Sequence, residues 1–376
     1  MITIEKIDTT DRKKVNEFVQ FQYDLYKGVP QYCPPFINDI KLMLNRKKHP
    51  FYEHSLADFF VARDSSGKMV GRIAAMENKP FNEYHKTKKC QFYLFDTVDD
   101  QEVANKLFEA AFAWAHEHGL NEFVGPKGFA SFDGYGILVE GFEHHQMMTM
   151  MNYNFPYYAK LLENIGFEKE VDFVSCYIAK ENFILPEKVK KVSEIAQKRG
   201  SFKVLNYSTK RELMKHAWDV GNAYNHTFVN NWEYYPLSKG EVKLLLDNLL
   251  VVANPKLIKL ITHDDEIVGF LLAFPDITSA LQRHGGKITP LALIDIALEM
   301  KKTKWVAVNG AGVLPKYHGL GGNAILYSEM EKTIKDFGFE HCEMTQVAET
   351  AEQMRKDLIN LGGQPYKNHR IFHKSI

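Results

Sequence analysis

The chain has 376 residues, too many for one typical hydrophobic core, so its length favours about two domains. The composition is that of an ordinary globular protein, with 45% hydrophobic and 25% charged residues. Lys plus Arg equal Asp plus Glu at 47 each, which disfavours nucleic acid or a membrane as a main partner. Neither a basic leader nor an apolar run of roughly 18 residues is present, so we expect a cytoplasmic protein.

No metal site or disulfide framework is predicted. The four cysteines are widely scattered and form no Cys-x-x-Cys pair; they are Cys33, Cys90, Cys176 and Cys342. His369 and His373 are four residues apart on a predicted strand, which separates them by roughly 13 Å, too far to share a metal ion.

The first half of the chain predicts an alternation of strands and helices. Apolar residues at every second position predict strands, and apolar residues at every three to four positions predict helices. The predicted order is strand, helix and hairpin, followed by strand, helix, strand, helix and strand. In chain order the ranges are 2–7, 15–25, 57–63 with 68–76, 91–98, 102–118, 123–125, 157–165 and 173–178.

The second half repeats this order after a charged helix over 187–199. The predicted ranges are 202–207, 211–224, 257–262 with 267–274, 305–313, 324–337, 341–347, 351–361 and 366–373. Matching features recur at a steady offset: a Val-Gly pair at 70–71 returns at 268–269, and a helix-ending glycine at 166 returns at 362. A steady offset is what a duplicated unit shows.

A glycine-rich turn joins the apolar strand over 305–313 to the helix over 324–337. Gly319, Gly321 and Gly322 let the backbone approach a ligand closely. The first amides of the helix point into the same turn, with the positive end of the helix dipole behind them. The turn is therefore predicted to bind an anion, most naturally a phosphate. The Gly-Lys-Ser/Thr sequence of the Walker loop is absent.

The segment Val313-x-Pro315-x-Tyr317-His318-Gly319-Leu320-Gly321-Gly322-Asn323 resembles the acyl-CoA loop of the GNAT acetyltransferase superfamily. His318 stands where that family has Arg or Gln, and Asn323 where it has Gly or Ala. The element order of both halves is similar to the GNAT fold. The resemblance implies an α/β fold (mixed, α+β-like) of two tandem acyl-CoA N-acyltransferase-type domains, each a mostly antiparallel sheet flanked by helices. Their expected bounds are 1–180, a connector helix over 181–200, and 201–376.

The resemblance implies an N-acetyltransferase that moves an acetyl or other acyl group from acyl-CoA to a small-molecule amine. The second copy would bind the cofactor through Val313, Leu314, His318, Gly319, Leu320, Gly321, Gly322, Asn323 and Ala324. The first copy has no glycine at this place and carries carboxylates that would repel phosphates: Asp96, Asp99, Asp100 and Glu102. Its aromatic loops over 125–136 and 147–158 are candidates for a pocket, and the insertion over 279–303 for a wall over the cofactor.

The catalytic groups are less defined, because the tyrosine that the family carries near its last helix end is Leu358 in this chain. Glu343 and Glu349 are the candidate bases, and Tyr327 and Tyr366 the candidate acids. Two alternatives stay open, a non-catalytic binder of acyl-CoA or another metabolite and an aminoacyltransferase of the Fem kind. The sequence does not indicate the oligomeric state.

Overall fold

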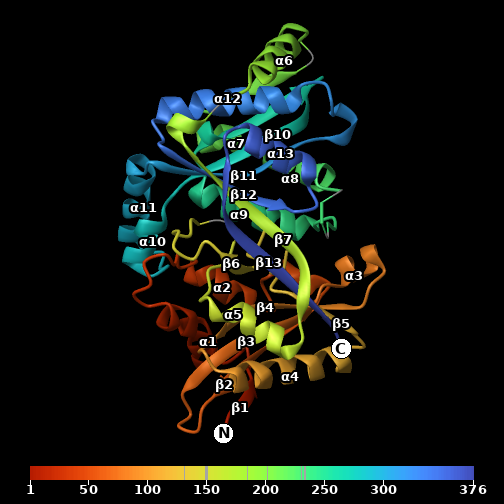
Figure 1. Cartoon of the computed structure of the whole chain (residues 1–376), viewed down its shortest axis with the longest axis vertical. Coiled ribbons are helices and arrows are strands. Elements are labelled where there is room, and N and C mark those ends of the chain that lie inside the picture. Colours follow the sequence, from red (N-terminus) through yellow and green to blue (C-terminus); the bar gives the residue numbers. More distant parts are fainter. Residues whose placement is uncertain (131, 149–150, 184, 201, 230, 233) are drawn as a thin grey trace. The chain divides into compact units, whose positions relative to one another are not determined.

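The computed structural model describes residues 1–130, 132–148, 151–183, 185–200, 202–229, 231–232 and 234–376, and Figure 1 traces the chain. The chain divides into two compact units. Unit 1 contains Met1–Phe173, Ile277–Glu299 and Lys367–Ile376, and unit 2 contains Val174–Asp276 and Met300–Tyr366. Each unit has a sheet with helices packed on it, as predicted from the sequence.

In unit 1, β1 to β4 pair antiparallel in sequence order, and β4 pairs parallel with β5. The strands are β1 (Thr3–Lys6), β2 (Leu56–Arg63), β3 (Met69–Glu77), β4 (Lys89–Thr97), β5 (Glu122–Gly125) and β6 (Ile137–Glu140). The helices are α1 (Arg12–Leu25), α2 (Ile37–Met43), α3 (Lys79–His85), α4 (Gln101–Glu117), α5 (Tyr157–Ile165), α10 (Thr278–His284) and most of α11 (Pro290–Lys302).

In unit 2, β8 to β11 pair antiparallel in sequence order, and β11 pairs parallel with β12. The strands are β8 (Lys203–Leu205), β9 (Ile258–His263), β10 (Glu266–Pro275), β11 (Trp305–Val313) and β12 (His341–Ala348). The helices are α6 (Glu187–Lys198), α7 (Lys210–Met214), α8 (Ala217–Thr227), α9 (Lys239–Val252), α12 (Gly322–Phe337) and α13 (Glu352–Asn360). Both units therefore have the predicted mixed α/β class with mostly antiparallel pairing.

Two long strands contribute residues to both units, β7 (Glu168–Ala179) and β13 (Gln364–Ser375). The end of β13 pairs antiparallel with β5, from Phe372 opposite Gly125 to Ser375 opposite Glu122. The compact units therefore differ from the bounds expected from the sequence. Residues 277–299 and 367–376 belong to unit 1, whereas the end of β7 and helix α6 belong to unit 2. Residue 201, the expected start of the second domain, lies outside the described residues.

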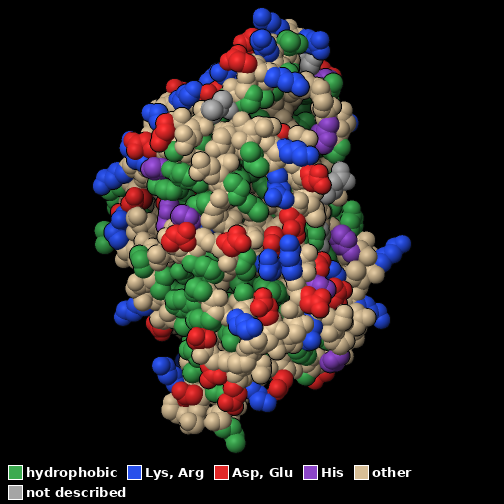
Figure 2. Space-filling model, viewed as in Figure 1, with side chains coloured by type: hydrophobic (Ala, Val, Ile, Leu, Met, Phe, Trp, Pro, Cys, Tyr) green, Lys and Arg blue, Asp and Glu red, His purple; other side chains and the backbone are tan. Residues whose placement is uncertain are grey.

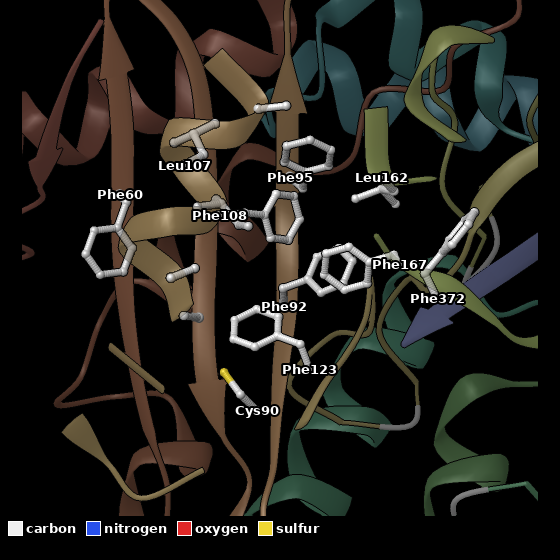
Figure 3. Close-up of a cluster of buried hydrophobic side chains, with 14 of the residues drawn as sticks. Phe60, Cys90, Phe92, Phe95, Leu107, Phe108, Phe123, Leu162, Phe167 and Phe372 are labelled. Atoms are coloured by element: carbon white, nitrogen blue, oxygen red, sulfur yellow. The ribbon is translucent and has the colours of Figure 1, made fainter. Parts of the chain in front are cut away.

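The core of unit 1 is rich in phenylalanine (Figure 3). Helix α4 supplies Phe108, whose ring meets that of Phe92 on β4 edge to face, with centroids 5.2 Å apart. Phe372 from β13 is buried in the same cluster. The last residues of the chain thus complete the core of the unit with which the chain begins.

Replacing Phe372 by Ala is expected to lower the free energy of unfolding by roughly 3–5 kcal/mol, because it leaves a cavity in this core. Urea unfolding followed by circular dichroism measures the change. The matched control is Phe337→Ala on α12, where the side chain is partly exposed. A loss no larger than that of the control would contradict the placement of Phe372.

Unit 1 also buries a neutral histidine on β13. His369 is 2% exposed, and its Nε2 donates to the carbonyl of Asn152 at 2.9 Å. Burial, and secondarily the charge of Lys367, lowers the pKa of His369 from 6.5 to about 3. Between these two values the unfolded chain binds a proton that the folded chain does not bind. The stabilisation is therefore complete above the unfolded pKa and is lost as the pH falls.

The protonation of His369 is expected to destabilise the protein by about 2 kcal/mol between pH 7 and pH 5. His369→Gln keeps a donor near Nε2 but does not titrate, so its free energy of unfolding should fall less over this range. Urea unfolding at the two pH values gives the difference, with the exposed His116→Gln as the matched control. Equal pH dependence in wild type and His369→Gln would contradict the assignment.

Candidate functional site

The predicted anion loop lies in unit 2, where β11 leads through a short 3-10 turn (Pro315–Tyr317) into α12. Gly319 and Gly321 have φ of +77° and +93°, a left-handed backbone that favours glycine. In the described part of the chain, the amides of residues 321–324 have no hydrogen-bond acceptor. These N–H groups and the helix dipole make the start of α12 suited to an anion.

Helix α6 packs against this loop, beside α12 (Figure 1). A Cβ atom on Gly321 would lie 2.9 Å from Cβ of Ala196 and 3.2 Å from Cγ1 of Val192. The glycine at 321 therefore has two roles: it permits the tight turn, and it allows α6 to approach the start of α12 closely. A bulky residue at 321 would disturb the packing of α6, so a cleaner test of ligand binding uses Asn323, whose side chain is exposed.

Three of the predicted cofactor residues, Val313, Leu314 and His318, take part in hydrogen bonds at the strand ends of unit 2. The ring Nε2 of His318 lies 2.7 Å from the carbonyl oxygen of Val313, and the N–H of Leu314 donates to Val268 at 2.8 Å. His318 therefore holds the loop against the end of β11. The N–H of Leu314 is therefore engaged within the sheet and does not face a ligand.

Strands β11 and β12 separate just before the loop. Their parallel register runs from Trp305 opposite His341 to Val308 opposite Met344. The pairing of β11 with β10 continues to Val313, across a bulge where Gly310 has a φ of +94°. Residues 309–313 are thus unpaired on the side of β12 in the described register. An extended ligand can hydrogen-bond such an edge as an added strand does.

Glu343 lies beside this separation, opposite Ala307 and one residue before the last β11–β12 pair. Its neighbours Cys342 and Met344 pack in the core below α12, so the Glu343 side chain lies on the other face of the sheet. The residue is 0% exposed, and its carboxylate accepts a hydrogen bond from the hydroxyl of Tyr366. Burial, and then the charge of Glu343, raises the pKa of Tyr366 far above its ordinary value. Tyr366 therefore remains a protonated donor.

Other polar groups share the face with Glu343. The hydroxyl of Tyr177 lies 2.7 Å from Nδ1 of His341, whose ring stacks on Trp305 with centroids 4.5 Å apart. Nearby on the same strands, the hydroxyl oxygens of Ser175 and Thr345 are buried without a hydrogen-bond partner in the described part of the chain. Unsatisfied buried hydroxyls are uncommon, and a bound polar molecule is one way to satisfy them.

Tyr327 and Glu349 do not join this pair. The hydroxyl of Tyr327 lies 3.7 Å from Sδ of Met354, in the core on the α12 side of the sheet, and burial raises its pKa. Glu349 follows the end of β12 and is partly exposed. Of the four predicted catalytic residues, the structure brings Glu343 and Tyr366 together.

The equivalent strand end in unit 1 is occupied by tyrosines. Thr97, the last residue of β4, donates its N–H to the hydroxyl of Tyr158 at 3.0 Å and accepts from that of Tyr157 at 2.7 Å. Asp96 is buried and paired with Arg72 at 2.6 Å, so it does not stand at the mouth of a loop as expected from the sequence. The main chain that would hold a cofactor in unit 1 is thus used within the protein.

Residues 277–299 of the insertion, which was expected to form a wall over the cofactor, belong to unit 1. Its helix α10 bonds within unit 1, where Gln282 donates to the carbonyl of Tyr32 at 2.8 Å and Gly286 accepts from Ile37 at 3.0 Å. Parts of the predicted aromatic loops, Ser131 and residues 149–150, lie outside the described residues.

The architecture of the two units is that of tandem GNAT proteins. A solved tandem GNAT protein from the clavulanic acid biosynthesis pathway superposes with a TM-score of 0.56, at 11% identity, and covers 100% of this chain and 98% of its own. A GCN5-related glucosamine N-acetyltransferase region of a fungal multi-domain β-N-acetylglucosaminidase superposes equally well, at 0.56 and 13% identity, over 38% of that chain. The fold predicted from the glycine loop and the duplication is thereby confirmed.

Two curated proteins resemble the sequence over nearly its full length. Protein YghO of Escherichia coli (strain K12) is 24% identical over 372 residues, which are 97% of this chain and 94% of that protein. The bacterial ceramide synthase of Caulobacter vibrioides (strain NA1000 / CB15N) is 25% identical over 375 residues, 96% of this chain and 95% of that protein. No family model matches the chain.

Proposed function

We propose that the protein is an N-acyltransferase that binds an acyl-CoA in unit 2 and transfers the acyl group to an amine. One observation carries this proposal: the glycine loop with unpaired amides follows a strand that separates from its neighbour beside a buried carboxylate, Glu343. The GNAT fold of the chain supports the same class of reaction.

The cofactor would bind along these two features. Its pyrophosphate would accept hydrogen bonds from the amides of residues 321–324, at the positive end of α12. Its pantetheine arm would lie along the free edge of residues 309–313, with the thioester near the bulge at Gly310. An N–H group of this edge would stabilise the oxyanion of the tetrahedral intermediate.

Glu343 is the proposed general base, and Tyr366 orients its carboxylate. The carboxylate accepts a proton from the substrate ammonium, directly or through one water. The free amine then forms a C–N bond with the thioester carbonyl carbon, and the C–S bond breaks. The thiolate takes up the proton that the nitrogen loses as the amide forms, and it leaves as the CoA thiol.

The acceptor class we propose is an amino alcohol. The relative named bacterial ceramide synthase covers 96% of this chain, and a ceramide is an amide of a long-chain amino alcohol. The buried hydroxyls of Ser175 and Thr345 are on the same face as Glu343 and suit a polar acceptor that carries hydroxyl groups. Small amines without a hydroxyl group are the alternative within the same reaction.

The test is a transfer assay with the full chain. Acetyl-CoA and palmitoyl-CoA are each incubated with sphinganine, glucosamine, ethanolamine and a lysine ester. Release of the CoA thiol is followed with a thiol reagent, and the amide is identified by mass spectrometry. Amide formed with an amino alcohol supports the proposal. Binding of acyl-CoA without amide formation from any amine would favour a non-catalytic binder, the alternative that Leu358 at the usual tyrosine position suggests.

A further inference from the structure

Helix α11 in the insertion exposes an apolar stripe to solvent. Leu291, Ile294 and Leu298 are 72%, 59% and 50% exposed, and their spacing of three and four residues places them on one face of the helix. The opposite face holds Ala292 and Ile296, which are buried. A surface helix normally turns charged residues outward. In α11 both faces are apolar, so its outer face is available to a partner.

Basic side chains border this stripe. Lys287 precedes the helix, and Lys301 and Lys302 form its last turn. In the described part of the chain none of the three makes an ion pair, and all three are exposed. The acidic residues of the helix, Asp295 and Glu299, are both bound to Arg283, which balances one of their two negative charges. Figure 2 shows hydrophobic and basic side chains, with acidic and histidine side chains among them, where Figure 1 labels α10 and α11.

A groove of about 660 Å³ opens beside the start of the helix. It lies between α1, α2 and residues 287–289, and Lys41 and Lys287 are among its lining residues. Lys41 also makes no ion pair in the described part of the chain. Glu17 also lines the groove, where Arg63 binds its carboxylate. Two ammonium groups without an ion pair in a groove at the start of the helix form a suitable place for an anionic headgroup.

We propose that α11 docks on the surface of a bilayer that contains anionic lipids. The apolar stripe would lie among the acyl chains near the headgroups, and the four lysines would contact phosphates. A second copy of the chain fits less well, because a two-fold contact through this stripe would bring the lysines of both copies close together. No helix in the described part of the chain is long and apolar enough to cross a membrane.

Composition had led us to expect no membrane partner. The balance of 47 basic and 47 acidic residues describes the whole chain, whereas the attraction to a membrane depends on charges within about one Debye length of the surface, about 10 Å. The docking of α11 also does not depend on the proposed acyl transfer.

Flotation of the full chain with vesicles tests the proposal. The vesicles are phosphatidylcholine alone, or three parts phosphatidylcholine and one part phosphatidylglycerol. Wild type is expected to float with the anionic vesicles and to release at high salt. The variant Leu291→Gln/Ile294→Gln/Leu298→Gln is expected to bind on the order of 100-fold less, and each of Lys287→Ala and Lys301→Ala about fivefold less.

The matched control is Ile359→Gln on α13, a side chain that is 55% exposed like those of the stripe and that should leave binding unchanged. Glu343→Gln should also bind the vesicles as wild type does, which separates docking from catalysis. Circular dichroism confirms that each variant is folded. The proposal is overturned if wild type does not float with anionic vesicles, or if the triple variant floats equally well. A wild-type dimer that the triple variant abolishes, without vesicle binding, would assign the stripe to a second copy.

Discussion

Glu343→Gln is expected to lower the rate of amide formation by roughly 10²- to 10⁴-fold, the usual contribution of a general base. The glutamine fills the same buried space and can accept the Tyr366 hydrogen bond, but it cannot take a proton from the ammonium. The dissociation constant of acyl-CoA should not change, because the residue lies on β12 and not in the glycine loop. Steady-state thiol release and calorimetric titration measure the two quantities separately.

Two further variants test whether Glu343 acts as the base or in another role. Glu349→Gln should keep wild-type turnover, since Glu349 lies beyond the end of β12 and away from the Tyr366 pair. Tyr366→Phe should reduce turnover less than Glu343→Gln does, because it frees the carboxylate to rotate but leaves it in place. Full activity in Glu343→Gln, or an equal loss in Glu349→Gln, would show that another group accepts the proton.

Asn323→Glu is expected to weaken acetyl-CoA binding by roughly 10- to 100-fold, since it adds a negative charge beside the amides proposed to bind the pyrophosphate. A carboxylate in the first turn of a helix interacts favourably with the helix dipole. The variant should therefore be at least as stable as wild type, so weaker binding is not a result of unfolding. Calorimetric titration gives the affinity, and a thermal melt gives the stability.

Asn323→Gln is the control for this position, because it adds length without charge and should bind acetyl-CoA within about twofold of wild type. If Asn323→Glu binds as tightly as wild type, the pyrophosphate does not lie at the start of α12. If both variants lose binding equally, the effect is steric.

Elements with a strong local pattern were predictable from the sequence. The helix expected over 157–165 and the strand expected over 305–313 have those bounds in the structure. Each has a regular spacing of apolar residues and a glycine at or near its end, and these are local properties. Helix α9 was missed, although Ser238 and Glu241 form a capping box at its start. That spacing of serine and glutamate was the signal available.

Long-range pairing was not predictable in the same way. Strand β13 carries an alternating pattern that fits either unit, and its partner β5 lies far away in the sequence. The placement of residues 277–299 in unit 1 depends likewise on contacts that the insertion itself does not encode. The exposure of the apolar stripe of α11 was also not predictable from the sequence, because leucines at helical spacing are typical of a buried face.

The candidate site shows the same division. The glycine loop was identified from its own residues, because the backbone conformation of a glycine turn and the start of a helix depend on residues close by in the sequence. The contact of Tyr366 with Glu343 joins two strands and required the structure. The ring of His318 contacts the carbonyl of Val313, five residues earlier in the chain, and residue type alone does not determine that choice.

The most direct test of the central claim is a calorimetric titration of the full chain with acetyl-CoA. The proposed site predicts one molecule bound per chain, with unchanged affinity in Glu343→Gln and strongly reduced affinity in Asn323→Glu. No heat of binding at millimolar acetyl-CoA or palmitoyl-CoA, or wild-type affinity in Asn323→Glu, would contradict the assignment of the acyl-CoA site to the β11–α12 loop.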